Sequence, residues 1–519
     1  MTKQSSIKRA LISVYDKSDI LDLARLLAAN NVEILSTGGT AKFLMDNGVS
    51  VQPVSDITGF PEILGGRVKT LHPRIHGGIL AKRDKPEQMQ ELDSHQITPI
   101  DLVVINLYPF EKTIANPDCN LDTALENIDI GGPCMIRAAA KNFPAVVVLT
   151  DPKQYPEFIG EFKQNKGEIS AETRKKFARS AFLRTSRYDH TIQSYLKAES
   201  ETEEELFPQH ITLNLEKIQD LRYGENPHQK AALYNDMSTA VSGKQLHGKA
   251  LSFNNILDMY SAIGLVNEFD SPCAIVVKHN TPCGAALDDK IESAFERAFA
   301  TDSLSAFGGV VALNRPLTLA LAEKLSKIFL EVIIAPSFEE NALSVLTRKK
   351  NIRLIQWSGE TLPQEAFDIK RSHQGLLLQT LDRIEENLAG FNCVTETKPS
   401  ENDRQTILFG WQVGKWVKSN AIVYVKDRRT LGIGAGQMSR VDASRLAVRK
   451  AADAKLDLHG SILISDAFFP FRDGVDVAAE AGAIGVIQPG GSIRDQEVID
   501  AANEHKMFML FSGVRHFRH

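Results

Sequence analysis

Cysteine is scarce in this chain of 519 residues, and its spacing argues against two common frameworks. The five cysteines are Cys119, Cys134, Cys273, Cys283 and Cys393, and no two of them form a C-x-x-C pair. Small secreted scaffolds use a dense, even set of cysteines, and the commonest zinc frameworks use such pairs. We therefore expect reduced thiols.

Long apolar runs are also lacking, and so is an excess of either charge. No stretch approaches the ~18 apolar residues of a membrane-spanning helix, and the first apolar run is too short for a signal peptide. Lys and Arg number 60 against 65 Asp and Glu, a formal net charge of -5, which gives no broad basic field for nucleic acid. We expect a cytoplasmic protein that binds neither membrane nor nucleic acid.

What the chain does have is the make-up of a soluble protein with several domains. Hydrophobic residues make up 43% and charged residues 24%, as in globular chains. The length exceeds what one core usually organises, so we expect about three units. Residues 199–205, ESETEEE, carry five glutamates. Such a run indicates a solvated helix end or a linker, and we place the main boundary there.

Strand-like and helix-like segments alternate before this boundary. Apolar strands are predicted at residues 9–15, 32–36, 101–110 and 145–150, and helices at residues 16–31 and 40–48. This alternation favours a mostly parallel sheet covered by helices, an α/β fold.

Two segments beyond the boundary resemble each other. Residues 274–284 (AIVVKHNTPCG) and 421–436 (AIVYVKDRRTLGIGAG) are each an apolar strand that runs into Lys278 or Lys426 and then into a glycine-containing turn. A helix-like stretch and another short strand follow each. The resemblance suggests a duplicated α/β subdomain, and we place the second boundary near residue 370.

Two glycine-rich stretches of the first half could hold an anion. In LSTGGT, Thr37 to Thr40 fall between a strand and a helix, where free backbone amides suit a phosphate, although an ordinary turn would look the same. Residues 65–78, GGRVKTLHPRIHGG, combine basic side chains with glycines, as expected where an anionic substrate is approached closely. A mobile basic loop without a ligand is the alternative. Its two histidines lack an acidic third ligand, so zinc is not expected there.

Other polar residues at strand and helix ends could carry chemistry. Tyr108 follows an apolar strand, Asp129 precedes a Gly-Gly turn, and Lys141 ends a helix-like stretch. Brought together, a phenol, a carboxylate and an ammonium can shuttle protons; apart, each is an ordinary structural residue. In the second half, Arg222 and Arg440 could clamp a phosphate, and aromatic side chains nearby could stack on a planar ring.

KHNTPCG, residues 278–284, combines Lys278 and His279 with Pro282, Cys283 and Gly284, which are typical of a turn. Zinc deaminases pair H-x-E with P-C-x-x-C, and both partners are missing here. A histidine beside a lysine instead suits proton transfer with stabilisation of an oxyanion. A hydrogen-bonded loop histidine remains the alternative.

Taken in order, these motifs resemble one family, the bifunctional AICAR transformylase/IMP cyclohydrolases of purine biosynthesis. SVYDK, STGGTAKFL, GFPEILGGRVKTLHPRIHGGIL, NLYPF, IDIGG and RAAAKN are similar to its cyclohydrolase half. LRYGENPHQ, VKHNTPCG, AFGG, EVIIAP, SNAIV, GIGAGQMSR and SDAFFPFRDG are similar to its transformylase half. Several long motifs in order, from about residue 8 to His519, are far more specific than any single one.

The resemblance implies two reactions and a fold. The reactions are formyl transfer from 10-formyltetrahydrofolate, as cosubstrate, to AICAR, and dehydrating ring closure of the product FAICAR to IMP. The fold is a methylglyoxal-synthase-like parallel-sheet domain at residues 1–200, followed by two cytidine-deaminase-like α/β subdomains without zinc at 206–370 and 371–519. A homodimer that acts on small molecules is also implied.

The resemblance also implies roles for single residues of the transformylase half. Lys278 and His279 would be catalytic, with His279 as general base or proton shuttle and Lys278 as the cation that stabilises the tetrahedral intermediate or assists the leaving group. AICAR would be held by Arg222, Tyr223, Gly308, Asn420, Arg440, Phe468 and His519. The folate would be held by Pro470, Phe471 and Asp473.

In the cyclohydrolase half the resemblance implies a nucleotide site and four catalytic residues. FAICAR or IMP would be held by Ser13, Lys17, Ser36, Thr37, Gly38, Gly39, Thr40, Arg67 and Thr70. Catalysis would fall to Lys69, Tyr108, Asp129 and Lys141. Ring closure is intramolecular, so orientation and proton transfer are most of what the protein must add.

Three positions depart from the family pattern. Tyr15 stands where relatives often carry serine, Thr281 where asparagine is common, and Glu331 where some carry aspartate. Two other classes of function remain open, a purine-nucleotide sensor without catalysis and a zinc-dependent deaminase-type hydrolase. Retention of both catalytic sets argues against the sensor, and metal analysis would identify the hydrolase.

Overall fold

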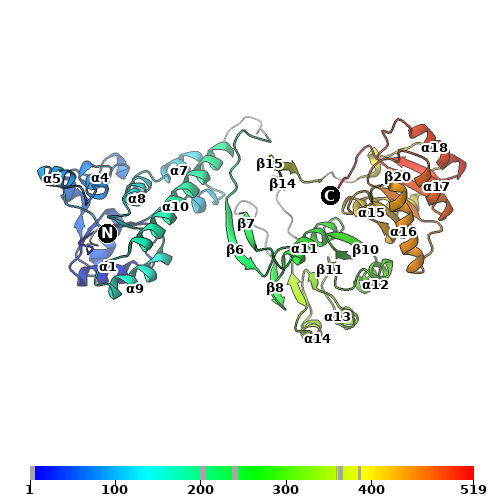
Figure 1. Ribbon diagram of the computed structural model, residues 1–519, viewed down its shortest axis with the longest axis horizontal. Coiled ribbons are helices and arrows are strands. Elements are labelled where there is room, and N and C mark those ends of the chain that lie inside the picture. Colours follow the sequence, from blue (N-terminus) through cyan, green and yellow to red (C-terminus); the bar gives the residue numbers. More distant parts are fainter. Residues whose placement is uncertain (1–5, 199–205, 237–242, 358, 360–365, 384–386) are drawn as a thin grey trace. The chain divides into compact units, whose positions relative to one another are not determined.

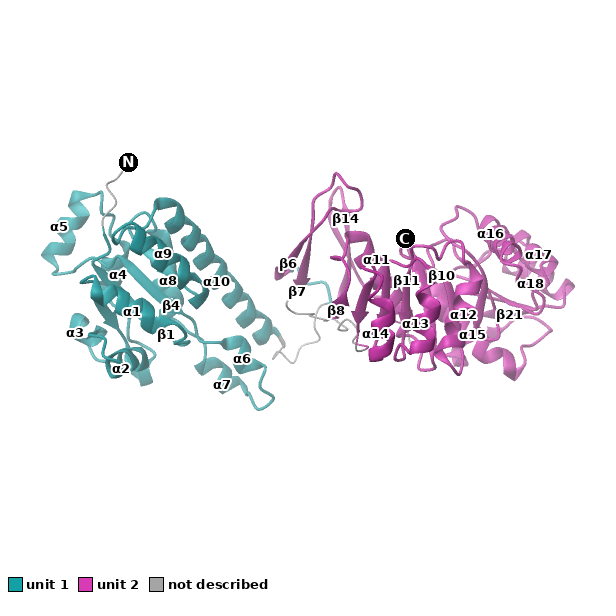
Figure 2. Cartoon of the chain, turned by 90° about the horizontal axis from the view of Figure 1, so that it is seen from below, with its two compact units in different colours: residues 1–212 teal, residues 213–519 magenta. Residues whose placement is uncertain are grey.

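The computed structural model describes residues 6–198, 206–236, 243–357, 359, 366–383 and 387–519. The chain forms two compact units, residues 1–212 and 213–519 (Figure 2), called here the N-terminal and C-terminal units. The acidic run 199–205, predicted as a solvated helix end or a linker, lies outside the described residues. Among the helices that are described, none has the length and apolar character needed to cross a membrane.

The N-terminal unit is built on a five-stranded sheet whose neighbouring strands all run parallel. The strand order is β3-β2-β1-β4-β5. The strands are β1 (Arg9–Val14), β2 (Glu33–Ser36), β3 (Gln52–Pro53), β4 (Leu102–Asn106) and β5 (Val147–Leu149). The parallel α/β sheet predicted from the alternation of segments is confirmed.

Helices cover both faces of this sheet (Figure 1). Successive side chains of a strand point to opposite faces, so Ala10 and Ile12 of β1 pack with α1 and α9, whereas Leu11 packs with α4 and α8. Helix α10 contributes to both cores. The helices are α1 (Ile20–Ala29), α2 (Gly38–Asp46), α3 (Val54–Thr58), α4 (Pro73–Leu80), α5 (Pro86–Ser94), α6 (Phe110–Ile114), α7 (Leu121–Glu126), α8 (Gly131–Lys141), α9 (Tyr155–Gln164) and α10 (Ala171–Ala198).

The C-terminal unit is organised by one 12-stranded sheet, in the order β16-β21-β20-β19-β17-β18-β10-β9-β11-β12-β13-β8. Two hairpins stand apart from it, β6 (Leu215–Leu221) with β7 (Ala231–Asp236), and β14 (Phe367–Ser372) with β15 (Gly375–Thr380). The strands of the large sheet are β8 (Lys244–His247), β9 (Cys273–Lys278), β10 (Thr281–Leu287), β11 (Val310–Leu313), β12 (Val332–Ala335), β13 (Arg353–Gln356), β16 (Asn392–Cys393), β17 (Ile422–Lys426), β18 (Arg429–Gly434), β19 (Ile462–Ser465), β20 (Gly485–Gln488) and β21 (Phe508–Phe511).

This sheet contains one arrangement twice. Outward from the central pair of β10 and β18, one half continues β9-β11-β12-β13-β8 and the other β17-β19-β20-β21-β16. The duplication suggested by the two similar segments is therefore visible in the strand order. Residue 370, our expected boundary, lies in β14, between the two halves in the sequence. The helices are α11 (Phe253–Val266), α12 (Ile291–Thr301), α13 (Leu319–Leu325) and α14 (Glu340–Leu346), then α15 (Glu401–Lys415), α16 (Arg440–Asp453), α17 (Asp473–Glu480) and α18 (Asp495–Glu504).

Side-chain hydrogen bonds join the two halves at the central strand pair. Thr430 Oγ1 accepts the Ala285 N–H at 3.0 Å and lies 3.1 Å from the Ala285 carbonyl oxygen. Thr301 Oγ1, at the end of α12, donates to the Thr430 carbonyl at 2.7 Å. These residues are buried, so the halves share one continuous interior at this point.

Glycines that we expected in turns lie in strands instead. Gly284 belongs to β10, together with Pro282 and Cys283, and Gly434 belongs to β18. The physical reason is helix packing. A Cβ on Gly284 would stand 1.9 Å from a backbone oxygen of α12, and one on Gly434 would stand 1.8 Å from a backbone oxygen of α16. Each glycine therefore lets a helix lie directly on its strand.

The actual turns after the two lysines are only two residues long. Lys278 and Lys426 are the last paired residues of β9 and β17, which leaves His279–Asn280 as the first turn and Asp427–Arg428 as the second turn. Their φ values are positive, 54° and 60° in the first and 49° and 55° in the second. Positive φ at both central residues is what a type I′ hairpin turn requires.

Candidate active sites

The predicted phosphate loop leads directly into α2, which begins at Gly38 with Thr37 as its N-cap. The first amides of a helix lack partners within the helix and form its positive end. Two loop hydroxyls are used inside the protein, since Ser36 Oγ donates to the β1 backbone at 2.6 Å and Thr40 Oγ1 does so at 2.9 Å. A Cβ on Gly39 would meet nothing within 4 Å. The loop is therefore braced by its side chains and open at its backbone, as a phosphate site needs.

A cavity of about 230 Å³ lies beside this loop. The predicted residues Ser36, Thr37, Gly38 and Lys69 line it. Sequence analysis did not single out the remaining lining residues, which are Ala41, Lys42, Met45, Pro53, Val54, Ser55, Phe60 and Glu62. Glu62, inside the GFPEIL motif, lies 3.4 Å from Lys69 Nζ, so a carboxylate holds this ammonium at the rim of the cavity.

Lys69 connects the phosphate loop with Asp129. Its Nζ lies 3.6 Å from the position that a Cβ on Gly38 would take, and its charge acts to lower the pKa of Asp129. Thr70, the next residue, is buried, and a Cβ on Gly131 would stand 2.8 Å from its Oγ1. Thr70 therefore lies against the first residue of α8, beside Asp129.

Asp129 lies at the N-terminus of α8. Its Oδ1 accepts the Gly132 N–H at 2.8 Å, and its own N–H donates to Tyr188 Oη at 2.8 Å. Burial raises the pKa of Asp129, and the hydrogen bond from Gly132 and the charge of Lys69 oppose that rise. A carboxyl group moved toward neutrality in this way suits proton transfer.

The Gly131–Gly132 pair forms the first residues of α8 and not the turn that we expected. A Cβ on Gly132 would stand 2.4 Å from Asp129 Oδ2. Glycine is therefore needed for the carboxylate to fold back over the helix end.

The structure does not bring all of the other predicted cyclohydrolase residues to this centre. Tyr108 is 42% exposed, and its ring packs edge-on against Tyr15 at 5.5 Å between centroids. Arg67 is exposed and ion-paired with Glu126. Lys141 ends α8, which places it about 15 Å from the Asp129 end at 1.5 Å rise per residue. The structure thus does not bring Lys141 to Asp129 within one chain.

Ser13 lies in β1, and Lys17 follows that strand. Ser13 Oγ lies 2.9 Å from Thr37 Oγ1, and Lys17 Nζ lies 6.0 Å from the ring centroid of Phe43 on α2. Ser13 therefore contacts the loop and Lys17 lies near α2, and their assignment to the nucleotide remains a prediction.

The predicted catalytic pair of the C-terminal unit lines a cavity of about 280 Å³. Lys278 and His279 enter it from the end of β9 and the first turn. The other lining residues are Thr281, Pro282, Cys283, Ser305, Ile433, Ala435, Leu446 and Lys450. Lys278 and Lys450 supply positive charge among these residues, and Lys450 Nζ is paired with Asp302 at 2.7 Å. The cavity therefore suits a ligand with anionic or carbonyl oxygen atoms.

Gly308 lies close to the ammonium of Lys278. Lys278 Nζ donates to the Phe307 carbonyl at 2.7 Å. Gly308 follows with a φ of 75°, and its N–H donates to the Phe329 carbonyl at 2.8 Å. The structure thereby brings Gly308 close to Lys278, one of the two predicted catalytic residues.

Arg440 and Asn420 lie near a buried carboxylate that sequence analysis missed. Asp466 accepts from Arg440 Nη2 at 3.1 Å and from the Ser419 hydroxyl. Asn420 Nδ2 donates to the Gln437 carbonyl at 2.8 Å. Burial lowers the pKa of Arg440, whose side chain is only 11% exposed. Asp466 belongs to the quoted SDAFFPFRDG motif, so its position in that motif was the available clue.

The predicted folate residues lie in the segment after β19 and at the start of α17. Phe471 is 47% exposed, and the Arg494 guanidinium covers its ring at 4.8 Å. Asp473 is the first residue of α17, and its Oδ1 accepts a backbone N–H at 2.8 Å. Pro470 is half-buried. This segment offers an exposed aromatic surface beside a carboxylate.

The remaining predicted AICAR residues are dispersed over the C-terminal unit. Arg222 and Tyr223 follow β6, and the guanidinium lies 5.5 Å from the tyrosine ring centroid. Phe468 is 36% exposed after β19, and the His519 ring lies 5.8 Å from that of Phe517. Their assignment to AICAR remains a prediction.

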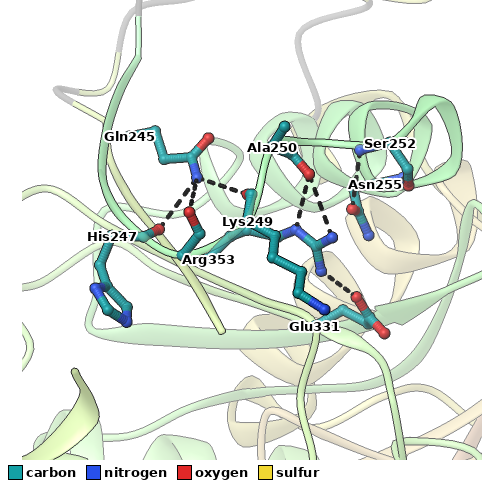
Figure 3. A network of polar contacts seen from close by, with 9 residues as sticks. Gln245, His247, Lys249, Ala250, Ser252, Asn255, Glu331 and Arg353 are labelled. Atoms are coloured by element: carbon teal, nitrogen blue, oxygen red, sulfur yellow. Dashed lines mark hydrogen bonds and ion pairs between the residues drawn. The ribbon is translucent and has the colours of Figure 1, made fainter. Parts of the chain in front are cut away.

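Glu331, one of the departures from the family pattern, is part of a polar network at the edge of the sheet (Figure 3). Arg353 forms an ion pair with Glu331 and donates to the Ala250 carbonyl at 3.3 and 3.4 Å. Gln245 Nε2 holds the segment before Ala250 by donating to the carbonyls of His247, Gly248 and Lys249. The longer glutamate is therefore held by a partner from β13.

The basic stretch that could have been a mobile loop is partly helical. His72 is the N-cap of α4, and its Nδ1 accepts the Arg74 N–H at 3.1 Å. His76 lies within α4, where burial lowers its pKa. In the part of the chain that the structure describes, no cluster of three or more His, Cys, Asp or Glu side chains could hold a metal.

Comparison with known proteins identifies two family models. The model of the AICARFT/IMPCHase bienzyme matches residues 139–450, and that of the MGS-like domain matches residues 19–134. The bienzyme model covers the His279–Asn280 turn and the cavity around it. The second covers the phosphate loop, Lys69 and Asp129.

Full-length relatives resemble the chain over almost its whole length. The bifunctional purine biosynthesis protein PurH of Acidithiobacillus ferrooxidans is 51% identical over 517 residues, with 99% of each chain covered. PurH of Magnetococcus marinus is 50% identical over 531 residues and covers 99% of this chain and 100% of its own. A crystal structure of ForH is 35% identical over 37% of this chain and 100% of that chain, with a TM-score of 0.33.

Proposed function

The chain belongs to the AICARFT/IMPCHase bienzyme family, and on that premise we propose how its residues carry two reactions. It is a bifunctional enzyme of purine biosynthesis with formyltransferase and IMP cyclohydrolase activities. One observation supports the assignment of the two reactions to different units. The phosphate loop with Asp129 lies in the N-terminal unit, whereas Lys278 and His279 lie in the C-terminal unit.

Formyl transfer takes place at the first turn, with 10-formyltetrahydrofolate as donor. The AICAR amine attacks the formyl carbon, a new C–N bond forms, and the bond from that carbon to folate N10 breaks. His279 takes the proton that the amine loses and returns one to N10. Lys278 faces the oxygen that becomes negative in the tetrahedral intermediate. A weakly basic aromatic amine needs such help.

The substrates of this reaction are held by the residues that the resemblance implies. Arg222, Tyr223, Gly308, Asn420, Arg440, Phe468 and His519 bind AICAR. Pro470, Phe471 and Asp473 bind the folate. The proximity of Gly308 to Lys278 and the exposure of Phe471 support this assignment.

Ring closure takes place in the N-terminal unit. The nucleotide phosphate binds at Ser36, Thr37, Gly38, Gly39 and Thr40, with Ser13, Lys17, Arg67 and Thr70 around it. Asp129 and Lys69, with Tyr108, move protons while the FAICAR carboxamide nitrogen attacks the formyl carbon and water leaves. The role that the resemblance implied for Lys141 would need that residue to reach the site from the second subunit of the homodimer, because it lies at the far end of α8 from Asp129. The raised pKa of Asp129 supports this role.

The finer features of the family are part of the same proposal. The halves of the 12-stranded sheet correspond to the cytidine-deaminase-like subdomains at 206–370 and 371–519, and they work without zinc. The cyclohydrolase domain spans residues 1–200. The protein acts in the cytoplasm as a homodimer on small molecules, with neither nucleic acid nor membrane as partner. The repeated strand order supports the pair of subdomains.

The decisive experiment supplies purified protein with AICAR and 10-formyltetrahydrofolate. We expect IMP, with tetrahydrofolate released in equal amount. Absence of both FAICAR and IMP would reject the proposal. Metal analysis of the same preparation should find no stoichiometric zinc, and one zinc per chain would instead favour a deaminase-type hydrolase.

A further inference from the structure

The first turn is held from behind by a carboxylate of α11. Asp258 Oδ1 accepts the Asn280 N–H at 2.6 Å, and the His279 N–H also faces this carboxylate. Burial raises the pKa of Asp258, and these two amides and the nearby side chains of His279 and Lys418 oppose that rise. The carboxylate therefore has the turn itself as its main polar partner.

Ser261, three residues further along α11, holds the other side of Asn280. Residues at this spacing share one face of a helix. The Ser261 hydroxyl is hydrogen-bonded to Asn280 Oδ1 and lies 3.4 Å from the Asn280 carbonyl oxygen. Ser261 is fully buried, so this hydroxyl is fixed by the packing around it.

Arg518 extends the same network into the second half of the sheet. Its Nη2 donates to Ser261 Oγ at 3.0 Å. Its guanidinium lies 4.4 Å from the Trp416 ring centroid and 5.6 Å from that of Tyr260. Its backbone pairs with Ser419, whose N–H donates to the Arg518 carbonyl at 2.8 Å. Arg518 is therefore anchored on the second half and reaches the helix behind the first turn.

The second turn has a different helix behind it. Helix α15 packs on β17 much as α11 packs on β9. Its buried positions are mostly apolar, such as Ile407 and Val413. Thr406 and Lys415 are the polar exceptions, and Lys415 is ion-paired with Glu268. The second turn bonds elsewhere, since the Asp427 carbonyl accepts from Arg297 and the Arg428 carbonyl accepts the Leu287 N–H at 2.9 Å. A polar helix face behind the turn is thus not a requirement of this type of hairpin.

We propose that Asp258, Ser261 and Arg518 are positioning residues that fix the His279–Asn280 turn for formyl transfer. The proposal rests on the proposed role of Lys278 and His279, and it adds residues that act through the turn. Asp258 fixes the turn's backbone, Ser261 fixes the Asn280 side chain, and Arg518 fixes Ser261. A displacement of about 1 Å at a reacting group can cost on the order of 100-fold in rate, so such bracing matters.

Ser261→Ala is the first test, because it removes one buried hydroxyl and almost no volume. We expect kcat for formyl transfer to fall by about 10-fold to 100-fold, with KM for AICAR within about twofold, because the turn and not a substrate contact has changed. Cyclisation of supplied FAICAR should be unchanged. An unaltered kcat, or a rise in KM alone, would overturn the proposal.

Ser444→Ala is the matched control. Ser444 is a fully buried serine on α16 in the second half, and its Oγ lies 2.7 Å from Tyr424 Oη. The chemical change is the same, but this hydroxyl bonds to β17 and not to a turn. Formyl transfer should stay within about twofold of wild type. Equal losses in Ser444→Ala and Ser261→Ala would show a general packing effect and would contradict the proposal.

A double-mutant cycle tests whether Arg518 acts through Ser261. Arg518→Ala alone should lower kcat. Arg518→Ala combined with Ser261→Ala should be no slower than the slower of the two single variants, because the path from Arg518 to the turn is already broken. Fully additive losses would mean that Arg518 acts by another route, and its assignment would fall.

Two substitutions of Asp258 separate its hydrogen bond from its charge. Asp258→Asn keeps an oxygen acceptor for the Asn280 N–H and should keep most of kcat, whereas Asp258→Ala should lose it. Equal losses would assign Asp258 an electrostatic role and reject positioning. If wild type makes no FAICAR from AICAR and 10-formyltetrahydrofolate, the proposed function itself fails. If wild type is active and these variants match it, only the positioning role fails.

Discussion

The first and second turns of the C-terminal unit share more than their backbone conformation. Lys278 donates to the Phe307 carbonyl just before β11 at 2.7 Å, and Lys426 donates to the His459 carbonyl just before β19 at 2.8 Å. The next residue in each segment is a glycine with a φ of 75°, Gly308 or Gly460. The N–H of each glycine donates to a loop carbonyl, at 2.8 and 2.9 Å.

This likeness shows which features belong to the scaffold. A lysine bonded to a loop carbonyl beside a positive-φ glycine occurs in both halves, so it does not by itself mark a catalytic site. The halves differ at the position after the lysine, which is His279 in the first turn and Asp427 in the second. They also differ in the polar residues behind the first turn. Function is a property of such sites and not of the fold that carries them.

Substituting the distinctive residue of each turn should give the largest difference in formyl-transfer activity between the halves. We expect His279→Asn to lower formyl transfer by about 10²-fold to 10⁴-fold, the usual contribution of a general base. Asn tolerates positive φ, so the turn should persist. Asp427→Asn, the matched change, should leave transfer within about twofold. Tetrahydrofolate release measures both, and equal losses would mean that the two turns do not differ in function.

Removing the shared lysine should give the next largest difference. Lys278→Ala should lower kcat for transfer by roughly 10²-fold to 10³-fold, as expected for a group that stabilises an oxyanion, while cyclisation of supplied FAICAR continues. Lys426→Ala removes only a hydrogen bond to a carbonyl and should lower the free energy of unfolding by about 1 kcal/mol. A slow Lys426→Ala enzyme would show that this lysine, too, serves the chemistry.

A change in the N-terminal unit should leave the comparison between the turns untouched. Asp129→Asn should slow cyclisation by roughly 10²-fold without altering formyl transfer. Loss of transfer as well would contradict the assignment of the two reactions to separate units.

The pH dependence of stability gives an independent test of Asp129. Burial raises the pKa of Asp129 in the folded state, so its stabilising contribution is present below the unfolded pKa and is lost as pH rises through the raised value. Asp129→Asn should therefore match wild type in acid and exceed it in stability near neutral pH. Urea unfolding of both proteins across this pH range measures the difference in stability. If Asp129→Asn is less stable than wild type at neutral pH, the buried charge of Asp129 does not destabilise the folded protein.

The two glycines should show the smallest difference. A Cβ on Gly308 would stand 3.4 Å from Phe329, and one on Gly460 would stand 3.4 Å from Lys426. Gly308→Ala and Gly460→Ala should each cost about 1–2 kcal/mol of stability, because both residues have positive φ. Only Gly308→Ala should also slow formyl transfer, by a few-fold. Thermal unfolding and transfer assays test the pair, and a similar slowing in both would remove the distinction.

Local patterns predicted the parallel sheet and the loop that leads into α2 because their clues lie within a few residues. An apolar run, a glycine pair and a helical repeat follow one another from β2 to α2. The same local reasoning failed at Gly284 and Gly434. A glycine can mark a turn or the close approach of a helix, and only the position of α12 or α16 decides between them.

Contacts between distant residues could not be predicted. Asp258 and the Asn280 amide are 22 residues apart, and Ser261 and Arg518 are 257 residues apart. In the sequence Asp258 is one acidic residue within a helical pattern, which is typical of a solvated surface. Asp466 was overlooked for a similar reason, since its burial depends on Arg440 and Ser419 from other elements.

The central pair of β10 and β18 also affects how this unit reaches its fold. Ala285 and Thr430, which bond across it, are 145 residues apart, and strand pairing over such distances makes folding slow. Until the pair forms, each half presents an unpaired edge strand. Two chains that fold side by side can then join the first half of one to the second half of the other. Such an exchanged dimer would keep the native hydrogen bonds of the sheet.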